Sequence, residues 1–318
     1  MHIYIIFLLL VVQTTIDVLL IKFTQTRGLI YHPNVLLLVV ELIKFTFSCL
    51  MITLNQNIQL LIAEIQRYPM SNLRYSVPAL LYSAQNYLIF IAVRRLNVPT
   101  FQITYQLRIL YTAFFAHIMI GKTHTRRQLC ALMMLTAGVI LLHSEAITTF
   151  VKFDIIGIIT TLIAALLSSF AGVYIEKIMK DKSNTDKFTG MIIRQWQLGL
   201  FTIPINIASL WIVGGVHNPF ENFDNKYIWC IIICSSIGGI LVATMICYAD
   251  SIIKCFATSV SIIICGFASL WIDNRYNPSI QLVIGGFVVL FALFLYTFSD
   301  PKTNSDETIP LTESLQES

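Results

Sequence analysis

Apolar stretches long enough to cross a lipid bilayer recur along this chain, and they constrain its fold more than any other feature. The hydrocarbon core of a bilayer is about 30 Å thick, so each helical crossing needs roughly 20 mostly apolar residues. Stretches of this kind run, in order, over Ile3–Lys22, Pro33–Leu54, Leu73–Val93, Pro99–Ile120, Gln128–His143, Phe153–Tyr174, Met191–Val213, Tyr227–Tyr248, Ile252–Trp271 and Ser279–Phe298. The sequence therefore predicts an all-α integral membrane protein with about ten transmembrane helices.

The composition excludes a soluble globular protein. Of the 318 residues, 56% are hydrophobic and only 12% are charged, and the mean hydropathy is +0.75. One soluble core cannot enclose that much apolar surface, so membrane lipids must solvate much of it. The cations are spread over loops and spans instead of forming one stripe, so no nucleic-acid partner is expected.

The join between the eighth and ninth spans is the least clear boundary. Tyr227–Trp271 is almost unbroken apolar sequence, and it has neither proline nor glycine near the join. A single helix of that length, at about 1.5 Å per residue, would be roughly twice as long as the bilayer core is thick. We therefore expect a break between Tyr248 and Phe256.

An even number of spans places both termini on one side of the membrane. The loops on that side hold Arg67, Arg74, Lys122, Arg126, Arg127, Lys180, Lys182 and Lys187. The loops on the other side hold Arg27, Arg94, Arg95 and Lys152. This modest excess of cations favours cytosolic termini.

Two polar segments are expected to lie outside the spans. Asn55–Tyr68 mixes polar and apolar residues, so we predict an amphipathic linker at the membrane surface. Residues 300–318 are acidic and contain few large apolar side chains, which predicts a disordered cytosolic tail. The rest of the chain, 1–299, forms the predicted ten-helix domain.

The spans divide into two halves of five, at about 1–146 and 147–299. Many transporters consist of two halves related by inverted topology, with the substrate bound near the membrane midplane between them. Arg108 precedes Thr112 and Ala113 in the fourth span, and Lys254 precedes the small and hydroxylated run Ala257–Ser261 in the ninth. A cation before a small-residue run at matching places in the two halves favours an internal repeat.

Ionisable residues within the spans are the first candidates for a binding site, because a charge in the bilayer needs a partner or a water-filled cavity. Arg108 lies about ten residues into its span, roughly 15 Å deep by helical rise, and no acidic residue shares that span. Its partner is either an anionic ligand or a carboxylate on another helix, Glu41 or Asp17. Glu41 and Lys44 are three residues apart and can pair on one helix face, in a structural role or in transport.

Polar and small side chains also gather on single helix faces. Tyr82, Gln85 and Asn86 share one face of the third span, where they either bind a base or sugar or hydrogen-bond to other helices. The small residues of the sixth span are Ser168, Ser169 and Gly172. Such a patch serves either close helix packing or the close approach of a ligand.

Catalytic chemistry finds no support in these residues. The sequence offers no nucleophile–base pair, no metal-ligand cluster and no phosphate-binding glycine loop, so we expect neither an enzyme nor a metal or cofactor site. All seven cysteines lie in apolar stretches without CxxC spacing, which is typical of small buried side chains.

Deep cations beside polar faces indicate a carrier of organic anions.

Several segments resemble the Golgi nucleotide-sugar transporters. These are Pro78–Tyr82 followed by Gln85 and Asn86, Phe101–Leu110, Phe170–Lys177, and Tyr248–Asp250 followed by Lys254–Ser259. The resemblance covers most of the chain and is to the branch that carries UDP-galactose, UDP-N-acetylglucosamine and CMP-sialic acid. It implies the drug/metabolite transporter fold with pseudo-symmetric inverted halves, and exchange of a nucleotide sugar for a nucleoside monophosphate.

The resemblance also implies a binding site, in which a Lys at the position of Arg108 and a Lys at Lys254 engage the phosphates. Together with the polar faces it gives these expected substrate-binding residues: Tyr82, Gln85, Asn86, Gln106, Arg108, Ser168, Ser169, Gly172, Gln195 and Lys254. The chain departs from the family pattern at Arg108 (for Lys), Ser169 (for Gly), Gln195 (for Asn), Cys247 (for Lys) and Cys255 (for Gly).

The favoured substrates are UDP-galactose and UDP-N-acetylglucosamine, exchanged for UMP across the Golgi membrane. Gly238–Ala243, Phe101 and Ala257–Ser259 are more similar to the members that carry these sugars. The alternatives are CMP-sialic acid exchanged for CMP, another organic anion carried on the same fold, or a membrane scaffold that transports nothing. The endoplasmic reticulum as location and a homo-oligomeric state stay open.

Overall fold

The computed structural model describes residues 2–29, 31–54, 59, 62, 73–96, 98–142, 154–180, 187–213, 220, 222–272 and 280–298. The regular elements in this described part are all helices: α1 (His2–Thr26), α2 (Pro33–Leu54), α5 (Ser76–Arg95), α6 (Val98–Tyr105), α7 (Arg108–Ile120), α8 (Arg126–Leu142), α10 (Ile155–Met179), α11 (Lys187–Val213), α12 (Lys226–Tyr248), α13 (Ser251–Ile272) and α14 (Ile280–Thr297). The predicted acidic tail lies outside the described residues, as does nearly all of the predicted linker 55–68.

Helices occupy all of the predicted apolar stretches, and within the described residues six helices are long and apolar enough to cross a bilayer. These are Ile3–Ile21, Pro33–Leu54, Ser76–Val93, Ile155–Met179, Lys226–Tyr248 and Ser251–Ala268. For the other helices, membrane crossing stays a prediction. The expected break after Tyr248 is present, because α12 ends there and α13 begins at Ser251. The Asp250 carboxylate caps α13 by accepting a 2.7 Å hydrogen bond from the backbone N–H of Ile253.

The fourth predicted span is not one continuous helix, and this corrects the sequence-based prediction. α6 ends at Tyr105 and α7 begins at Arg108. At the junction the N–H of Gln106 donates to the carbonyl of Ile103, and the N–H of Leu107 donates to that of Thr104, so the chain tightens into i→i−3 bonds. Polar side chains at the junction also bond to other helices, and a continuous helix would aim them differently.

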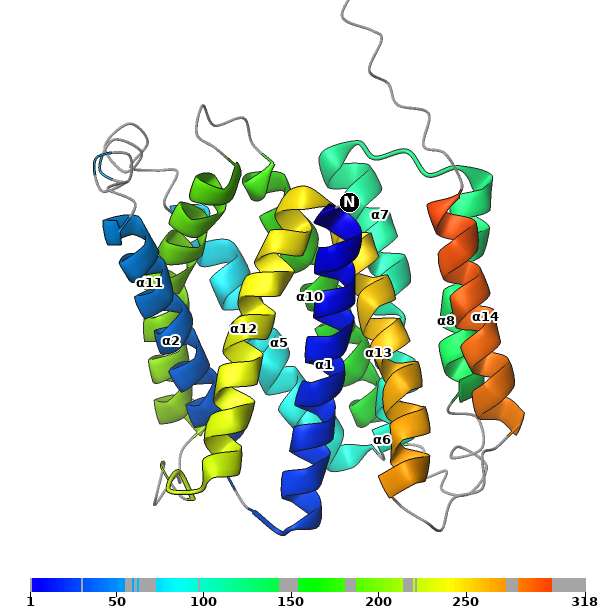
Figure 1. Ribbon diagram of the computed structural model, residues 1–318, viewed down its shortest axis with the longest axis horizontal. Helices are drawn as coiled ribbons and strands as arrows, with labels where there is room; N and C mark the ends of the chain where they lie inside the picture. Colours follow the sequence, from blue (N-terminus) through cyan, green and yellow to red (C-terminus); the bar gives the residue numbers. More distant parts are fainter. Residues whose placement is uncertain are drawn as a thin grey trace, which may run out of the picture.

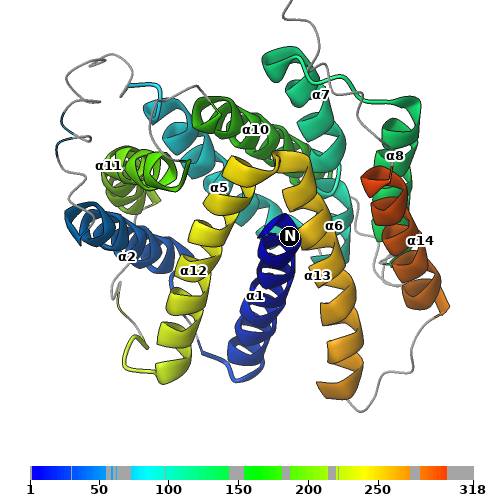
Figure 2. The same ribbon diagram turned by 45° about the horizontal axis from the view of Figure 1, so that its top comes forward.

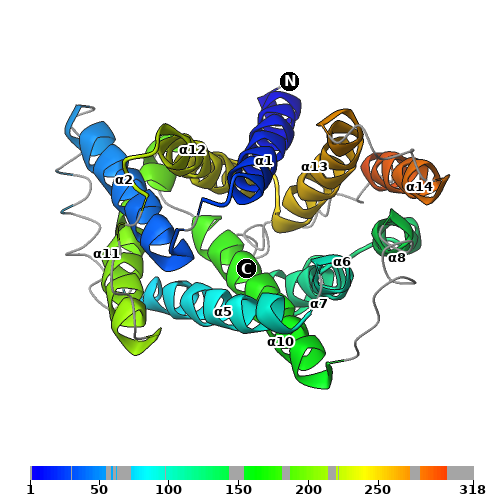
Figure 3. The same ribbon diagram turned by 90° about the horizontal axis from the view of Figure 1, so that it is seen from below.

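The helices form two rows, which Figure 3 shows along the helix axes. One row contains α2, α12, α1, α13 and α14, and the other contains α11, α5, α10, α6 with α7, and α8. α1 packs against both α12 and α13, and it lies between them in Figures 1 and 2. At the two ends of the rows, α2 pairs with α11 and α8 pairs with α14. Each row therefore mixes helices from the first and second halves of the chain.

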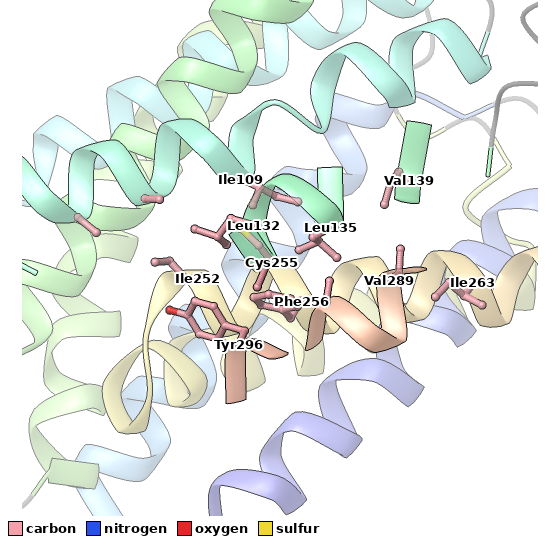
Figure 4. Close-up of a cluster of buried hydrophobic side chains, with 14 of the residues drawn as sticks. Ile109, Leu132, Leu135, Val139, Ile252, Cys255, Phe256, Ile263, Val289 and Tyr296 are labelled. Carbon is pink, nitrogen blue, oxygen red and sulfur yellow. The ribbon is translucent and has the colours of Figure 1, made fainter. Parts of the chain in front are cut away.

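Apolar clusters hold the rows together on two sides of the bundle. In one cluster Phe256 of α13 lies among Leu132 and Leu135 of α8 and Tyr296 of α14, with a centroid distance of 4.9 Å between its ring and that of Tyr296 (Figure 4). A second cluster joins α2, α5, α10, α11 and α12, and two smaller ones join α2 with α12 and α1 with α12 and α13.

Candidate functional site

A cavity of about 240 Å³ lies between α2, α5, α10, α11, α12 and α13. Its polar lining consists of Glu41, Lys44, Tyr82, Ser83, Asn86, Gln195, Thr202, Asn206 and Lys254. Apolar side chains such as Leu37, Ile175 and Val242 complete the wall. A cavity with a mainly apolar wall and a few convergent polar groups is the usual form of a small-molecule site.

The structure brings only some of the expected site residues to this cavity. Tyr82, Asn86, Gln195 and Lys254 line it, and so does the expected ion pair of α2. Gln85, Gln106, Arg108, Ser168, Ser169 and Gly172 are not among the lining residues. Most of this second group forms a hydrogen-bonded layer between the helices.

Glu41 and Lys44 form the ion pair that their spacing predicts, with 2.5 Å between Lys44 Nζ and Glu41 Oε1. The second carboxylate oxygen of Glu41 accepts a 3.2 Å hydrogen bond from the Thr202 hydroxyl of α11. Gly239 of α12 makes room for Lys44, because a Cβ at residue 239 would lie 2.6 Å from Lys44 Cδ. Three helices therefore fix this pair at the cavity wall.

Arg108 is the first residue of α7, directly after the break. Its guanidinium donates a 2.8 Å hydrogen bond to the Thr258 hydroxyl of α13, and it lies 5.1 Å from the centre of the Tyr105 ring. Its Nε is buried without a hydrogen-bond partner. Neither Glu41 nor Asp17 pairs with it, since Glu41 pairs with Lys44 and the Asp17 carboxylate accepts from the Ser235 hydroxyl. The carboxylate alternative for Arg108 is therefore wrong for these two residues.

The polar layer around Arg108 ties α5, α6, α10 and α13 together. The Gln85 amide donates to the Tyr105 hydroxyl at 3.1 Å, and that hydroxyl donates to the Ser168 hydroxyl, also at 3.1 Å. On the other side of the break, the Gln106 amide donates to the Ser259 hydroxyl at 2.9 Å. Gln85 and Ser168 thus make contacts between helices, one of the two roles considered for them. Gln106, expected only as a substrate-binding residue, also makes a contact of this kind.

Ser169 and Gly172 support the positions of the two cations. The Ser169 hydroxyl donates to the main-chain carbonyl of Arg108 at 2.8 Å. The main-chain carbonyl of Gly172 accepts a 3.1 Å hydrogen bond from the Ser251 hydroxyl, one turn before Lys254. Arg108 bonds to Thr258, one turn after Lys254 on α13, so the two cations lie near each other and their charges repel. Within the described residues no carboxylate pairs with either of them, so an anion between them would relieve this repulsion.

Sequence reasoning missed part of the α11 wall. Thr202 and Asn206 lie one and two turns beyond Leu198 and share a face with Gln195. The spacing 195, 198, 202 and 206 carries this signal, but Pro204 inside the helix conceals a regular pattern. Of the departures from the family pattern, Gln195 lines the cavity, whereas Cys247 and Cys255 are buried away from it. No metal-binding group of three or more His, Cys, Asp or Glu occurs within the described residues.

The class of protein follows from these features. A helical membrane bundle encloses a cavity whose polar groups are amides, hydroxyls, an ion pair and Lys254, which has no carboxylate partner in the described part of the chain. A second cation, Arg108, lies outside the lining but near Lys254. This is the arrangement of a carrier for polar, negatively charged solutes. The chain belongs to the nucleotide-sugar transporter family, whose sequence model matches residues 1–297.

Curated relatives agree over nearly the whole chain. It is 33% identical to the UDP-N-acetylglucosamine transporter of Rattus norvegicus, over 94% of this chain and 96% of the relative. It is 34% identical to a UDP-N-acetylglucosamine/UDP-N-acetylgalactosamine transporter of Caenorhabditis elegans, over 94% of both chains. It is 32% identical to the UDP-galactose translocator of Bos taurus, over 92% of this chain and 77% of the relative. These relatives are named as transporters and not as enzymes.

The fold is also found in a solved crystal structure. That structure superposes with a TM-score of 0.70 over 93% of this chain and 97% of the other, at 13% sequence identity. At this identity the likeness concerns the arrangement of helices alone.

Proposed function

We propose that this protein exchanges a UDP-sugar for UMP across the Golgi membrane, with UDP-N-acetylglucosamine and UDP-galactose as the favoured substrates. The observation that carries the proposal is the pair of cations, Lys254 on the cavity wall and Arg108 behind it, without a carboxylate partner in the described part of the chain. The choice of UDP as the nucleotide, and of these sugars, rests on the names of the relatives.

The proposed architecture is a ten-span bundle with two inverted halves, 1–146 and 147–299. Helix contacts support it, because several of the main contacts between helices are made once from each half. α1 contacts α12 and α13, and α10 contacts α5, α6 and α7; α2 contacts α12, and α11 contacts α5. Two contacts would then join a helix to its own counterpart in the other half: α2 with α11, and α8 with α14. The termini would face the cytosol.

In the proposed complex the phosphates lie between Lys254 and Arg108. Lys254 offers a compact charge, and Arg108 offers a planar fork with several donors. Arg108 would exchange its hydrogen bond to Thr258 for one to phosphate, and its unpartnered Nε is a further donor. A doubly charged phosphate group would thereby gain charge-assisted hydrogen bonds from both halves of the protein.

The rest of the cavity would hold the uridine and the sugar. Tyr82 and Asn86 would stack on and hydrogen-bond the pyrimidine, with Gln195 facing them from α11. Hydroxyl and amide groups of Thr202 and Asn206 suit sugar hydroxyls. The Glu41–Lys44 ion pair would close this end, either as a fixed wall or as a pair that opens during transport.

Transport would follow alternating access, in which the two halves rock around the central site. A UDP-sugar and UMP carry nearly the same charge, so their exchange moves little net charge across the membrane. The protein would act without an enzymatic step and without a cofactor.

The first experiment is a thermal-unfolding panel on purified protein with UMP, CMP, GMP and AMP, since a ligand that binds only the folded state raises the unfolding temperature. Stabilisation by UMP alone supports the proposal, and exchange of individual UDP-sugars in proteoliposomes then identifies the sugar. Selective stabilisation by CMP would indicate CMP-sialic acid. No stabilisation by any nucleotide would contradict the proposal and favour another organic anion or a scaffold.

A further inference from the structure

A second and larger cavity, of about 560 Å³, lies between α1, α13, α14 and the segment 121–128. We call it the α1–α14 groove. Its wall consists mainly of apolar side chains, among them Phe7 of α1, Ile253 and Phe256 of α13, and Leu293 and Tyr296 of α14. It shares only the start of α13 with the surroundings of the central site, and none of the substrate residues proposed above lines it.

The α1–α14 groove borders on the surface that faces lipid. Beside it α1 exposes Ile5 and Leu8, and α14 exposes Phe291 and Phe294. Tyr4 and Thr297, which are exposed, lie on its edge. A hydrocarbon chain can therefore pass from the bilayer over the partly exposed side chains of Phe7 and Leu293 without crossing a polar barrier.

The rim of the groove at the membrane surface is positively charged. Lys122 lines it, and Arg126 and Arg127 stand at the start of α8, directly before the lining residue Gln128. Asp250, the acidic group among the lining residues, is already paired with Lys122. Arg126 and Arg127 are exposed in the first turn of α8. This turn is held in place by Thr125 and Gln128, which bond to each other's backbone N–H as a capping box.

We infer that the α1–α14 groove binds an anionic phospholipid, with an acyl chain along Phe7 and Leu293 and the phosphate at Lys122, Arg126 and Arg127. A zwitterionic lipid can fill the apolar part equally well, but it gains little from the basic rim. Basic pockets between transmembrane helices are suited to acidic headgroups, and each cation near an anionic headgroup is worth about a five-fold change in binding. The net positive rim thus selects the headgroup, and the groove selects a lipid over free phosphate.

The test uses the full-length protein purified in detergent and native mass spectrometry with added phosphatidylserine or phosphatidylcholine of the same acyl chains. The wild type should retain one phosphatidylserine in preference to phosphatidylcholine. The double variant Arg126→Gln/Arg127→Gln should lower this preference by about 25-fold, at roughly five-fold per cation. Lys177→Gln/Lys187→Gln removes two exposed cations from the same end of the bundle but not from the groove, and it should change nothing.

A groove-filling variant separates a lipid site from a surface effect of charge. Thr297→Trp should abolish retention of phosphatidylserine while leaving the unfolding temperature of the lipid-free protein unchanged, because Thr297 is exposed at the groove edge. Equal retention of the two lipids by the wild type would overturn the proposal. So would displacement of the lipid by millimolar inorganic phosphate, or an equal effect of the control pair Lys177 and Lys187. The readout is lipid mass, so it is independent of whether the protein transports a UDP-sugar.

Discussion

The Ser169 hydroxyl donates a 2.8 Å hydrogen bond to the main-chain carbonyl of Arg108, and it thereby joins α10 to the first residue of α7. The Arg108 carbonyl also accepts a 2.7 Å hydrogen bond from the Thr112 hydroxyl of α7, so Ser169 adds a bond from a second helix directly after the break. The resemblance to the family expects glycine at this position, which has no donor. Because the acceptor is a main-chain carbonyl, this contact depends on the serine and would also form with lysine at residue 108.

Replacing Ser169 by alanine should lower the free energy of unfolding by about 0.5–1.5 kcal/mol, because the Arg108 carbonyl loses this donor. Thermal unfolding of the purified variant measures the effect. Thr160→Ala on the same helix is the control, since the Thr160 hydroxyl bonds only to its own helix on an exposed face. Equal losses in both variants would contradict a special role for Ser169.

Arg108→Ala should weaken UMP binding roughly ten- to a hundredfold, which is the usual effect of losing a hydrogen bond to a charged group. Arg108→Lys should retain much of the affinity, because it keeps the charge although it loses the planar fork. UMP-dependent thermal stabilisation gives both values. The control is Arg95→Ala. Arg95 is the last residue of α5 and pairs with Asp154, so its loss should leave UMP affinity unchanged. Full UMP affinity in Arg108→Ala would refute the phosphate role.

Two glycines should respond to alanine in opposite ways. A Cβ at residue 138 would lie 2.9 Å from Val289 Cγ2, so Gly138→Ala should force α8 from α14 and cost about 1–3 kcal/mol of stability. At Gly172 the nearest atoms would be 3.9 Å away, so Gly172→Ala should cost nothing and can gain up to about 1 kcal/mol from helix propensity. Thermal unfolding without ligand compares them. The reverse order would show that the helices pack differently.

Stability should depend on pH through His124, which lies between α7 and α8. Burial lowers the pKa of this imidazole below its usual 6.5, and the nearby Lys122 charge lowers it further. The folded protein therefore favours neutral His124, and this contribution to stability is present above about pH 6.5 and is lost as the pH falls. Unfolding temperatures at about pH 7.5 and about pH 5.5 should differ less for His124→Gln than for the wild type. Identical differences would contradict the assignment.

Periodicity and spacing predicted the features that depend on one helix at a time. The apolar stretches gave the helix positions, the length of Tyr227–Trp271 required a break, and the three-residue spacing of Glu41 and Lys44 predicted their ion pair. In each case the decisive distance lies within a single element. Helical geometry converts such distances directly into sequence separations.

Features that depend on helix register could not be predicted in this way. Arg108 bonds to Thr258, and Gln106 bonds to Ser259, across about 150 residues of chain. The sequence near the fourth span does not predict how α13 is placed against it, and so it does not predict which α13 hydroxyls will face it. The tightened turn at residues 106 and 107 follows from these contacts, and so the sequence pattern indicated one unbroken helix.

The packing of α1 against α12 and α13 imposes an order of events during synthesis. Gln13 and Asp17 in α1 hydrogen-bond to residues of α12 that follow 221 and 218 positions later in the chain. At translation rates of roughly 5–20 residues per second, α1 therefore spends on the order of 10–40 s in the membrane before α12 is made. Throughout this interval the Gln13 amide and the Asp17 carboxyl group need other hydrogen-bond partners, either in the insertion machinery or elsewhere in the nascent chain. The second half of the polypeptide thus completes the folding of the first helix.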